Sequence, residues 1–315
     1  MEKLTNCLVC NHDKHRAFVS CLDHTVSSET FNVVQCEGCG FRFTNPRPDE
    51  NEIGKYYQAE EYISHSDTSK GLVNKLYKIV RNYTIGKKVK LINRQTINHS
   101  RRDSFGATST IKRLLDIGCG TAEFLHACKT NGWNVTGIEP SEVARKKAKE
   151  KFDLPIYPSL QALPLGGEGG GLFNVITLWH VLEHVHELEK TITEINKLLL
   201  DDGTLIVAVP NCDAWDAKKY GAHWAAWDVP RHLYHFTRKD IETLFKKYGF
   251  KLSEVLPMKF DSFYVSLLSE KYKTARLPDG QGKSNLISGF MNGLISNFSA
   301  DKNGYSSQIY IMKKN

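Results

Sequence analysis

Residues Leu114–Leu125 read LLDIGCGTAEFL, and the organisation of the chain can be worked out from them. Two leucines suit a buried strand, Asp116 ends it, and Gly118 and Gly120 permit a sharp turn before apolar residues at 122, 124 and 125 open an amphipathic helix. Glycines let a ligand approach the backbone, and a helix N-terminus offers free N–H groups at its positive dipole end. The stretch therefore predicts a strand-turn-helix unit that holds a ligand.

Strand and helix patterns alternate from residue 111 to the end of the sequence. Strands are expected to end at Asp116 and to occupy 133–140, 154–158, 173–179, 204–210, 250–257 and 308–314, and helices to occupy 121–131, 141–152, 186–200 and 237–248. Gly203 is expected to turn the chain before the fifth strand. The alternation predicts an α/β fold with a Rossmann-like, seven-stranded, mostly parallel sheet and helices on both faces.

Two CxxC pairs, Cys7 with Cys10 and Cys36 with Cys39, precede this region. Two such knuckles supply the four thiolates of a closed tetrahedral zinc site, which folds a module and has no open position for catalysis. Asn11 and Gly40 follow the pairs and tolerate the left-handed turn that a knuckle needs. We predict a zinc-ribbon-like module with structural zinc. A redox dithiol is the alternative, but it leaves one pair unexplained.

The glycine turn lacks the third glycine of a dinucleotide-binding motif, because position 123 is Glu. Instead, Asp116-Ile-Gly118-Cys-Gly120-Thr resembles the first motif of class I S-adenosylmethionine (SAM)-dependent methyltransferases. Glu139, LQALPL at 160–165 and LLLDDGTLIVAVPN at 198–211 resemble later motifs of that family, in order, over about 112–257. The resemblance implies SAM as cofactor, with Asp116 on its amino group and Glu139 on both ribose hydroxyls. The residues it assigns to SAM are Asp116, Gly118, Cys119, Gly120, Glu139, Pro140, Leu163, Leu178 and Trp179.

The layout is similar to deoxysugar C-methyltransferases, which also begin with a four-cysteine zinc module. We expect a zinc-binding module at 1–48, a helical, basic linker at 49–110, and a methyltransferase domain at 111–315 with an insertion at 258–305. The chain is too short for the extra C-terminal domain of those enzymes, so the resemblance leaves open whether carbon or oxygen is methylated.

Trp179-His-Val-Leu-Glu-His-Val follows the fourth strand, where the acceptor is expected. A Glu-His pair supplies the base in the deoxysugar enzymes, which implies that Glu183 orients His184 and that His184 accepts the proton. Quinone-ring O-methyltransferases contain a similar VLEHV, linked there to acceptor or metal binding. His180 stands where those enzymes often have Glu, which weakens the case for a divalent ion. The alternative for His184 is a buried structural histidine.

A second candidate region, 211–237, is rich in aromatic residues and histidines. We expect an aromatic lid over a ring-shaped or sugar acceptor, with His232 and His235 as further candidates for the base. Simple packing of the aromatic side chains is the alternative.

Composition narrows the functional classes. The 315 residues are 41% hydrophobic and 24% charged, with net charge +7 and no apolar run of the ~18 residues that a membrane span needs. This predicts a cytoplasmic protein. Between Lys70 and Arg113 there are twelve Lys or Arg and one acid, Asp103, which fits either an anionic partner or a solvated basic helix.

The expected function is methyl transfer to a small-molecule acceptor such as a nucleotide-sugar, a glycolipid precursor or a similar metabolite. One alternative is an RNA base methyltransferase that grips nucleic acid with the zinc module and the basic linker. A non-catalytic SAM-binding protein is the other. The insertion at 258–305 is expected either to complete the acceptor pocket or to make an oligomer contact, and the sequence leaves the oligomeric state open.

Overall fold

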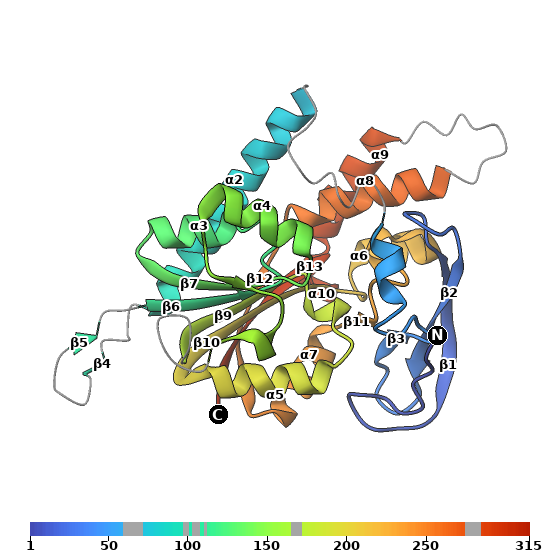
Figure 1. The fold of residues 1–315 in the computed structure, drawn as a ribbon. Coiled ribbons are helices and arrows are strands. Elements are labelled where there is room, and N and C mark those ends of the chain that lie inside the picture. The colour runs from blue at the N-terminus through green and yellow to red at the C-terminus, as the bar shows by residue number, and fades with distance from the viewer. Residues whose placement is uncertain (59–71, 97–100, 103–107, 110–111, 165–171, 275–284) are drawn as a thin grey trace.

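The computed structural model describes residues 1–58, 72–96, 101–102, 108–109, 112–164, 172–274 and 285–315 (Figure 1). The strands are β1 (His15–Leu22), β2 (Thr30–Cys36), β3 (Arg42–Thr44), β4 (Arg101–Arg102), β5 (Thr108–Ser109), β6 (Lys112–Ile117), β7 (Trp133–Ile138), β8 (Ile156–Tyr157), β9 (Phe173–Trp179), β10 (Leu199–Pro210), β11 (Tyr234–His235), β12 (Phe250–Pro257) and β13 (Ser307–Lys314). The α-helices are α2 (Leu72–Thr96), α3 (Glu123–Thr130), α4 (Glu142–Phe152), α5 (Leu188–Leu198), α6 (Trp215–Tyr220), α7 (Arg238–Lys247), α8 (Asp261–Thr274), α9 (Leu286–Phe298) and α10 (Ala300–Asn303). Short 3-10 turns are η1 (Ile53–Tyr57), η2 (Leu160–Ala162), η3 (Leu182–His184), η4 (Gly221–His223) and η5 (Ala225–Trp227).

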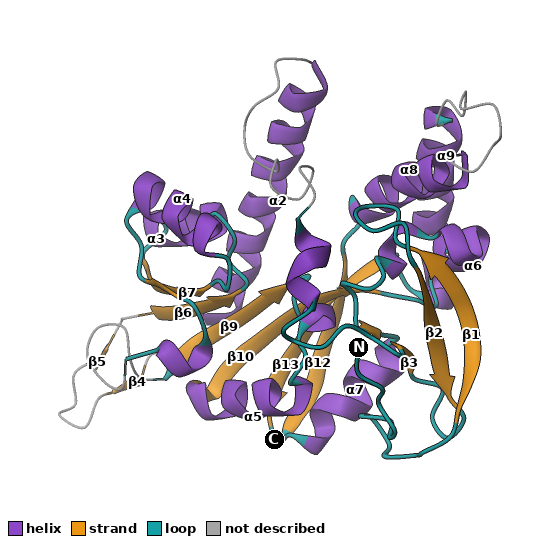
Figure 2. Ribbon diagram, turned by 45° about the vertical axis from the view of Figure 1, so that its right-hand side comes forward, coloured by secondary structure: helices purple, strands orange, loops and turns teal. Residues whose placement is uncertain are grey.

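A seven-stranded sheet in the order β12-β13-β10-β9-β6-β7-β8 forms the centre of the molecule. The pairs from β10 to β8 are parallel, and β13 runs antiparallel to both of its neighbours. Helices cover both faces of the sheet (Figure 2). The predicted fold class is therefore confirmed.

Successive strand residues face opposite layers, so the sheet has two cores. Leu115 belongs to the core shared with α5 and α7, whereas its neighbour Leu114 belongs to the core shared with α2, α3 and α4. β10 is longer than expected: it begins at Leu199, and the turn expected at Gly203 is a register shift within the strand. Backbone pairing with β9 resumes at Thr204, and this keeps Gly203 inside the sheet.

A second sheet, in the order β1-β2-β3-β11, carries the N-terminal cysteines. Its last strand comes from residues 234–235, far along the chain, and β3 pairs with it in register. Phe41 stacks on Tyr234 at 6.1 Å between ring centroids. The N-terminal module and the large sheet thus share one hydrophobic core.

The helical, basic linker expected at 49–110 contains one long helix, α2. It packs on α3 and buries Val89 and Ile92. The end of the linker expected at 49–110 lies mostly outside the described residues. The insertion expected between the last two strands contains α8, α9 and α10. Among the helices that the structure describes, none is long and apolar enough to cross a bilayer.

Candidate active site

The glycine turn between β6 and α3 adopts a conformation that only glycine tolerates well. Gly118 and Gly120 have φ of +72° and +55°, in the left-handed region. A Cβ on Gly118 would lie 2.3 Å from Cγ2 of Val181, so the position also has no room for a side chain. The amides of Gly118 and Cys119 both donate to the carbonyl oxygen of Ile138, which ties the turn to the end of β7.

Glu139 lies beside this turn, at the end of β7. Its Oε2 accepts a hydrogen bond from the amide of Gly120 at 2.8 Å, and its Oε1 accepts one from the amide of Ser141 at 2.9 Å. A carboxylate offers about four lone-pair positions, so two remain for a ligand's hydroxyl groups. The geometry places an acid with spare acceptor capacity next to the glycine turn.

Asp116 is buried below the same turn, only 3% exposed. Thr177 donates a hydrogen bond to its Oδ1 at 2.6 Å, but burial outweighs that bond and raises the pKa of Asp116 to about 7. The ammonium of Lys88, from α2, interacts electrostatically with this carboxyl and lies 4.2 Å above the ring of Trp179. Burial lowers the pKa of Lys88, so burial disfavours the charged form of both side chains at the ends of β6 and β9.

The remaining residues assigned to SAM lie around this turn in different ways. Cys119 points under the turn, since a Cβ on Gly137 would lie 2.7 Å from its Sγ. Leu178 is fully buried, so only its backbone can face a ligand, whereas Trp179 is partly exposed. Pro140 is exposed, and its carbonyl accepts from Arg145. Leu163 is partly buried just after η2.

His180 begins the acceptor side and sits between two carboxylates. Its Nδ1 lies 3.3 Å from Oε1 of Glu183, and its Nε2 lies 2.9 Å from Oδ2 of Asp261. Burial alone lowers the pKa of His180, but the hydrogen bonds to Asp261 and Glu183 outweigh it and raise the pKa to about 10. His180 is therefore a cation at neutral pH and cannot accept a proton there.

His184 is neutral, and among the described residues only one of its ring nitrogens has a hydrogen-bond partner. Its Nδ1 lies 3.0 Å from the carbonyl oxygen of Arg231 and 2.9 Å from the hydroxyl of Tyr57. A carbonyl only accepts, so Nδ1 carries the proton and the Nε2 lone pair is left open. Burial, followed by the charge of His232, lowers the pKa of His184 to about 4.

Glu183 and His232 complete this group. The Nδ1 of His232 lies 2.9 Å from the carbonyl oxygen of Ala226, its Nε2 lies 3.8 Å from Oδ2 of Asp228, and its ring lies 4.6 Å from that of His184. Glu183 is fully buried and bonds to His180, not to His184 as the Glu-His resemblance implies. Its Oε2 has no hydrogen-bond partner among the described residues. Ligand atoms of Glu183, His184 and His232 lie within 4.8 Å of one another, and such a donor set can hold a divalent cation.

His235 lies apart from this group, in β11. It is 3% exposed, its Nε2 lies 3.2 Å from the hydroxyl of Thr44, and its ring packs against Trp227 at 4.9 Å. Burial lowers the pKa of His235 well below its usual value. These contacts place it in the interface between the two sheets.

The profile of the family described as "Methyltransferase domain" matches residues 90–255, more than half of the chain. The chain belongs to this family. It is a class I SAM-dependent methyltransferase, as the glycine turn, Asp116 and Glu139 predicted.

Curated relatives of this methyltransferase include two ubiquinone biosynthesis O-methyltransferases. The one from Pseudomonas aeruginosa (strain UCBPP-PA14) is 26% identical over 174 residues, which are 52% of this chain and 73% of the relative. The one from Caulobacter sp. (strain K31) is 31% identical over 151 residues, which are 45% of this chain and 60% of the relative. Among solved structures, magnesium protoporphyrin IX methyltransferase from Synechocystis PCC 6803 with bound SAH matches with a TM-score of 0.51 at 15% identity, over 85% of this chain and all of that chain. That last likeness shows the shared fold.

Sequence reasoning missed two side chains that the methyltransferase fold brings to the site. The basic charge run between Lys70 and Arg113 includes Lys88. Lys88 also interrupts an inward apolar stripe that includes Val89 and Ile92. A lysine within such a stripe indicates an inward-facing charge. Tyr57 comes from η1, in the N-terminal part of the chain, and its hydroxyl lies 2.9 Å from Nδ1 of His184. The contact of Tyr57 with His184 spans 127 residues of sequence, so no local sequence pattern predicts it.

The four cysteines predicted to bind metal come together in the second sheet. Cys7 and Cys39 have Sγ atoms 3.6 Å apart, Cys10 and Cys36 have theirs 3.5 Å apart, and all four lie within 4.8 Å of one another. Four thiolates around a zinc ion at about 2.3 Å have sulfur atoms about 3.8 Å apart, so the cluster fits a tetrahedral ion. Asn11 and Gly40 have φ of 62° and 87°, which confirms the predicted left-handed turns.

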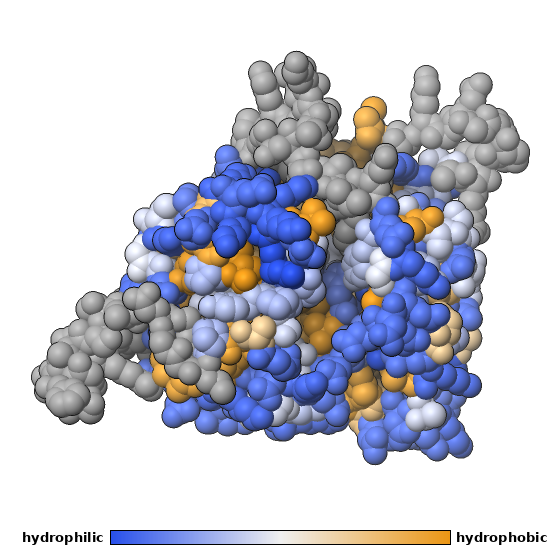
Figure 3. All heavy atoms as spheres, viewed as in Figure 1, coloured by the Kyte–Doolittle hydropathy of each residue, from blue (hydrophilic) through white to orange (hydrophobic). Residues whose placement is uncertain are grey.

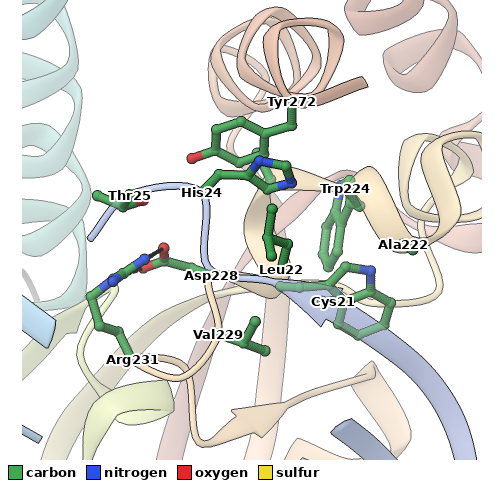
Figure 4. Close-up of a pocket in the computed structure, with 12 residues that line it drawn as sticks. Cys21, Leu22, His24, Thr25, Ala222, Trp224, Asp228, Val229, Arg231 and Tyr272 are labelled. Carbon is green, nitrogen blue, oxygen red and sulfur yellow. Dashed lines mark hydrogen bonds and ion pairs between the residues drawn. The ribbon is translucent and has the colours of Figure 1, made fainter. Parts of the chain in front are cut away.

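The aromatic lid expected at 211–237 is wrong. This segment forms α6, η4, η5 and β11, and Trp224 and Trp227 are 2% and 3% exposed in a core shared with the N-terminal sheet. A cavity between the β1–β2 turn and this segment measures about 10 Å³ and is lined by Trp224, His24, Tyr272 and Arg231 (Figure 4). That is room for about one water molecule. The aromatic side chains therefore pack the two sheets together, which was the alternative interpretation.

Proposed function

We propose that this methyltransferase transfers the methyl group of SAM to an oxygen of a small-molecule acceptor, such as a nucleotide-linked sugar, a glycolipid precursor or a similar metabolite. The observation that carries the proposal is a neutral His184 with an open Nε2, held in place by the carbonyl of Arg231 and the hydroxyl of Tyr57. A hydroxyl acceptor must lose a proton, and a neutral imidazole accepts one. The names of the two curated relatives also favour oxygen.

Residues on the cofactor side bind and orient SAM. We assign the amino group of SAM to Asp116, the ribose hydroxyls to Glu139, and the close approach of the backbone to Gly118 and Gly120. Lys88 lies near Asp116, and although burial lowers the pKa of Lys88, the carboxylate of the methionine part would favour its charged form. Together these groups hold the sulfonium in line with the acceptor, and positioning supplies much of the acceleration.

The transfer forms one bond and breaks one. The acceptor oxygen attacks the methyl carbon, the bond from that carbon to the sulfonium sulfur breaks, and the sulfur keeps the electron pair. The acceptor proton passes to Nε2 of His184, with His232 as the second candidate. His180 is already protonated, so its proposed part is to hold Glu183 and the start of α8 by its two hydrogen bonds.

We further propose that the four cysteines bind one structural zinc ion. Three contacts connect the N-terminal sheet with the acceptor side. β3 pairs with β11, and the hydroxyl of Thr44 donates to the carbonyl oxygen of His232 at 2.8 Å. Tyr57, from η1, contacts His184. Zinc would thus stabilise the half of the site that lies outside the sheet of the methyltransferase fold.

The RNA alternative loses some of its support. Arg81 and Arg94 of α2 pair with Glu123 and Glu254, and Lys88 turns inward, so these three charges are engaged within the protein. A small-molecule acceptor is the better proposal.

The test is methyl transfer from labelled SAM to a cell extract, with His184→Ala as the diagnostic variant. We expect His184→Ala to slow turnover by about a hundredfold with unchanged SAM affinity. His126→Gln is the matched control, because His126 stacks on Phe152 and touches none of the proposed groups. Unchanged turnover in His184→Ala would move the role to His232. Activity that requires added magnesium while the four-cysteine site keeps its zinc would indicate a cation at Glu183, His184 and His232 instead of a free base.

Label that appears only in RNase-sensitive material would reject the small-molecule acceptor. Absence of single-turnover transfer to any component would favour the non-catalytic alternative.

A further inference from the structure

Helix α9 buries its polar side and exposes its apolar side. Its sequence, LISGFMNGLISNF, contains no charged residue. The buried positions are Gly289, Asn292, Gly293 and Ser296, whereas Ile287 and Phe298 are each 78% exposed. The exposed apolar side chains of this helix are Leu286, Ile287, Phe290, Met291, Ile295 and Phe298. This is the reverse of an ordinary amphipathic helix such as α5, which buries Leu188, Ile192 and Ile195.

Polar contacts and close packing with α8 explain the reversed orientation. Asn292 donates to Glu270 at 3.1 Å and to the hydroxyl of Tyr220 at 2.8 Å, and Ser296 donates to Asp216 at 2.8 Å. Gly293 lets the helices approach, since a Cβ there would lie 2.8 Å from Cα of Phe263. Turning α9 over would leave Glu270 and Asp216 without these partners, so the apolar side is held outward.

The apolar surface continues onto neighbouring helices. Phe260 and Tyr264, at the start of α8, are 45% and 59% exposed. Phe260 meets Tyr83 of α2 edge to face at 5.6 Å between ring centroids. In Figure 3 the visible face is mainly hydrophilic over α4 and α5, and orange side chains project at its upper edge, where Figure 1 places α8 and α9. We call the exposed apolar side chains of α9 together with Phe260, Tyr264 and Tyr83 the apolar face.

Lysines flank the apolar face. Lys271 and Lys273 on α8 are exposed, as is Lys259 just before it, and Lys87 on α2 lies 5.4 Å above the ring of Tyr83. Of the acids in α8, Glu270 is buried and Asp261 pairs with His180. Apolar side chains bordered by lysines and tyrosines match the interface of an anionic bilayer. Lipid tails would cover the apolar side chains, and phosphate groups would meet the lysines and tyrosines at the border.

We propose that the apolar face docks this methyltransferase on the surface of an anionic lipid bilayer. At 13 residues, α9 is shorter than the ~20 residues of a membrane span, so it would lie in the plane of the interface. A second copy of the chain is a poorer occupant, because a two-fold contact would bring two lysine-bordered faces of like charge together. Since Asp261 bonds to His180, docking also places the acceptor side of the site next to the membrane.

Sedimentation with vesicles tests the proposal on the full chain. The wild-type protein should bind vesicles of phosphatidylcholine mixed with phosphatidylglycerol. It should bind vesicles of pure phosphatidylcholine much more weakly. The triple variant Ile287→Ser, Phe290→Ser, Phe298→Ser should bind at least about tenfold more weakly, because it loses most of the area that enters the lipid. Val143→Ser, which removes an exposed apolar side chain from α4, should bind like wild type.

A charge-reversed variant tests the ionic part. Lys271→Glu with Lys273→Glu should weaken binding to the anionic vesicles by about tenfold and leave binding to pure phosphatidylcholine unchanged. Lys239→Glu, at an exposed lysine of α7, is the matched control. SAM affinity and the near-ultraviolet circular dichroism of each variant show whether it remains folded.

Three outcomes would overturn the proposal. The first is a wild-type protein that stays in solution with both kinds of vesicle. The second is equal binding by the wild type and a folded triple variant. The third is a wild-type dimer in light scattering that becomes a monomer in the triple variant, which would assign the apolar face to a second copy.

Discussion

The cofactor side and the acceptor side of the site are built in different ways. On the cofactor side, Asp116, Gly118, Gly120 and Glu139 lie within a single strand-helix-strand unit, and the bond from Gly120 to Glu139 spans 19 residues. On the acceptor side, His184 contacts Tyr57 across 127 residues and Arg231 across 47. The first half depends on local backbone geometry, and the second depends on how distant segments are held together.

Because the two sides are built differently, substitutions on each side should affect different measurable quantities. Changes in the glycine turn should act on SAM affinity, and changes in the N-terminal sheet should act on turnover. This separation of SAM affinity from turnover can be tested with variants on each side of the site, of which loss of a cysteine ligand has the largest expected effect.

Loss of a cysteine ligand should abolish turnover with a small effect on SAM binding. Cys36→Ser removes one thiolate from the proposed zinc site, where the ion would contribute on the order of 10 kcal/mol to folding of its module. The pairing of β3 with β11 and the contact of Tyr57 with His184 should then be lost, and turnover should fall at least about a thousandfold. Metal analysis and calorimetry with SAM measure the two effects.

Cys21→Ser is the control for this change, because Cys21 is buried but outside the metal cluster. It should keep the zinc content that we propose for the wild type, about one ion per chain. Equal loss of SAM affinity and turnover in Cys36→Ser would break the separation of the two halves.

Two glycine variants test the cofactor side. Gly118→Ala meets both a left-handed φ and the side chain of Val181, so SAM affinity should fall on the order of a hundredfold. Gly120→Ala meets the left-handed φ alone, with nothing within 4 Å of the new methyl group, and should lose less than about tenfold. Calorimetry compares them, and similar losses for both would contradict the steric argument.

The pH dependence of SAM binding tests Asp116. Burial raises the pKa of this carboxyl to about 7, so below pH 7 it is protonated before the cofactor binds. Pairing with the ammonium of SAM needs the ionised form, so binding releases a proton and affinity should fall about tenfold per unit as pH drops from 7 to 5.5. Asp116→Asn should bind SAM more weakly and without this slope. A slope that persists in Asp116→Asn would assign the titration to another group.

The smallest expected effect concerns Tyr57. Tyr57→Phe removes the hydroxyl at 2.9 Å from His184 but leaves the carbonyl of Arg231 in place, so turnover should fall only about threefold to tenfold. Tyr83→Phe, at an exposed tyrosine of α2, is the control in the assay of soluble acceptor. A change in SAM affinity instead of turnover would place Tyr57 on the cofactor side.

Periodic segments were predicted well, and contacts between distant segments were not. The strands at 173–179 and 250–257 have the bounds that their patterns predicted, and Ser141 caps α4 as expected. The aromatic residues of 211–237 were assigned to an open lid, but they are buried because the N-terminal sheet covers them. Their residue types are the same in either case, so the pattern alone did not distinguish a lid from a core.

The cofactor side was determined by the sequence itself, because a left-handed turn, a strand end and a helix start are properties of neighbouring residues. The two cysteine knuckles belong to the same class, as Asn11 and Gly40 show. Only the tertiary structure decided which nitrogen of His184 is open, that Lys88 turns inward and that α9 faces outward. Each of these depends on partners from distant parts of the chain, whose burial and hydrogen bonding set the charge and orientation of a side chain.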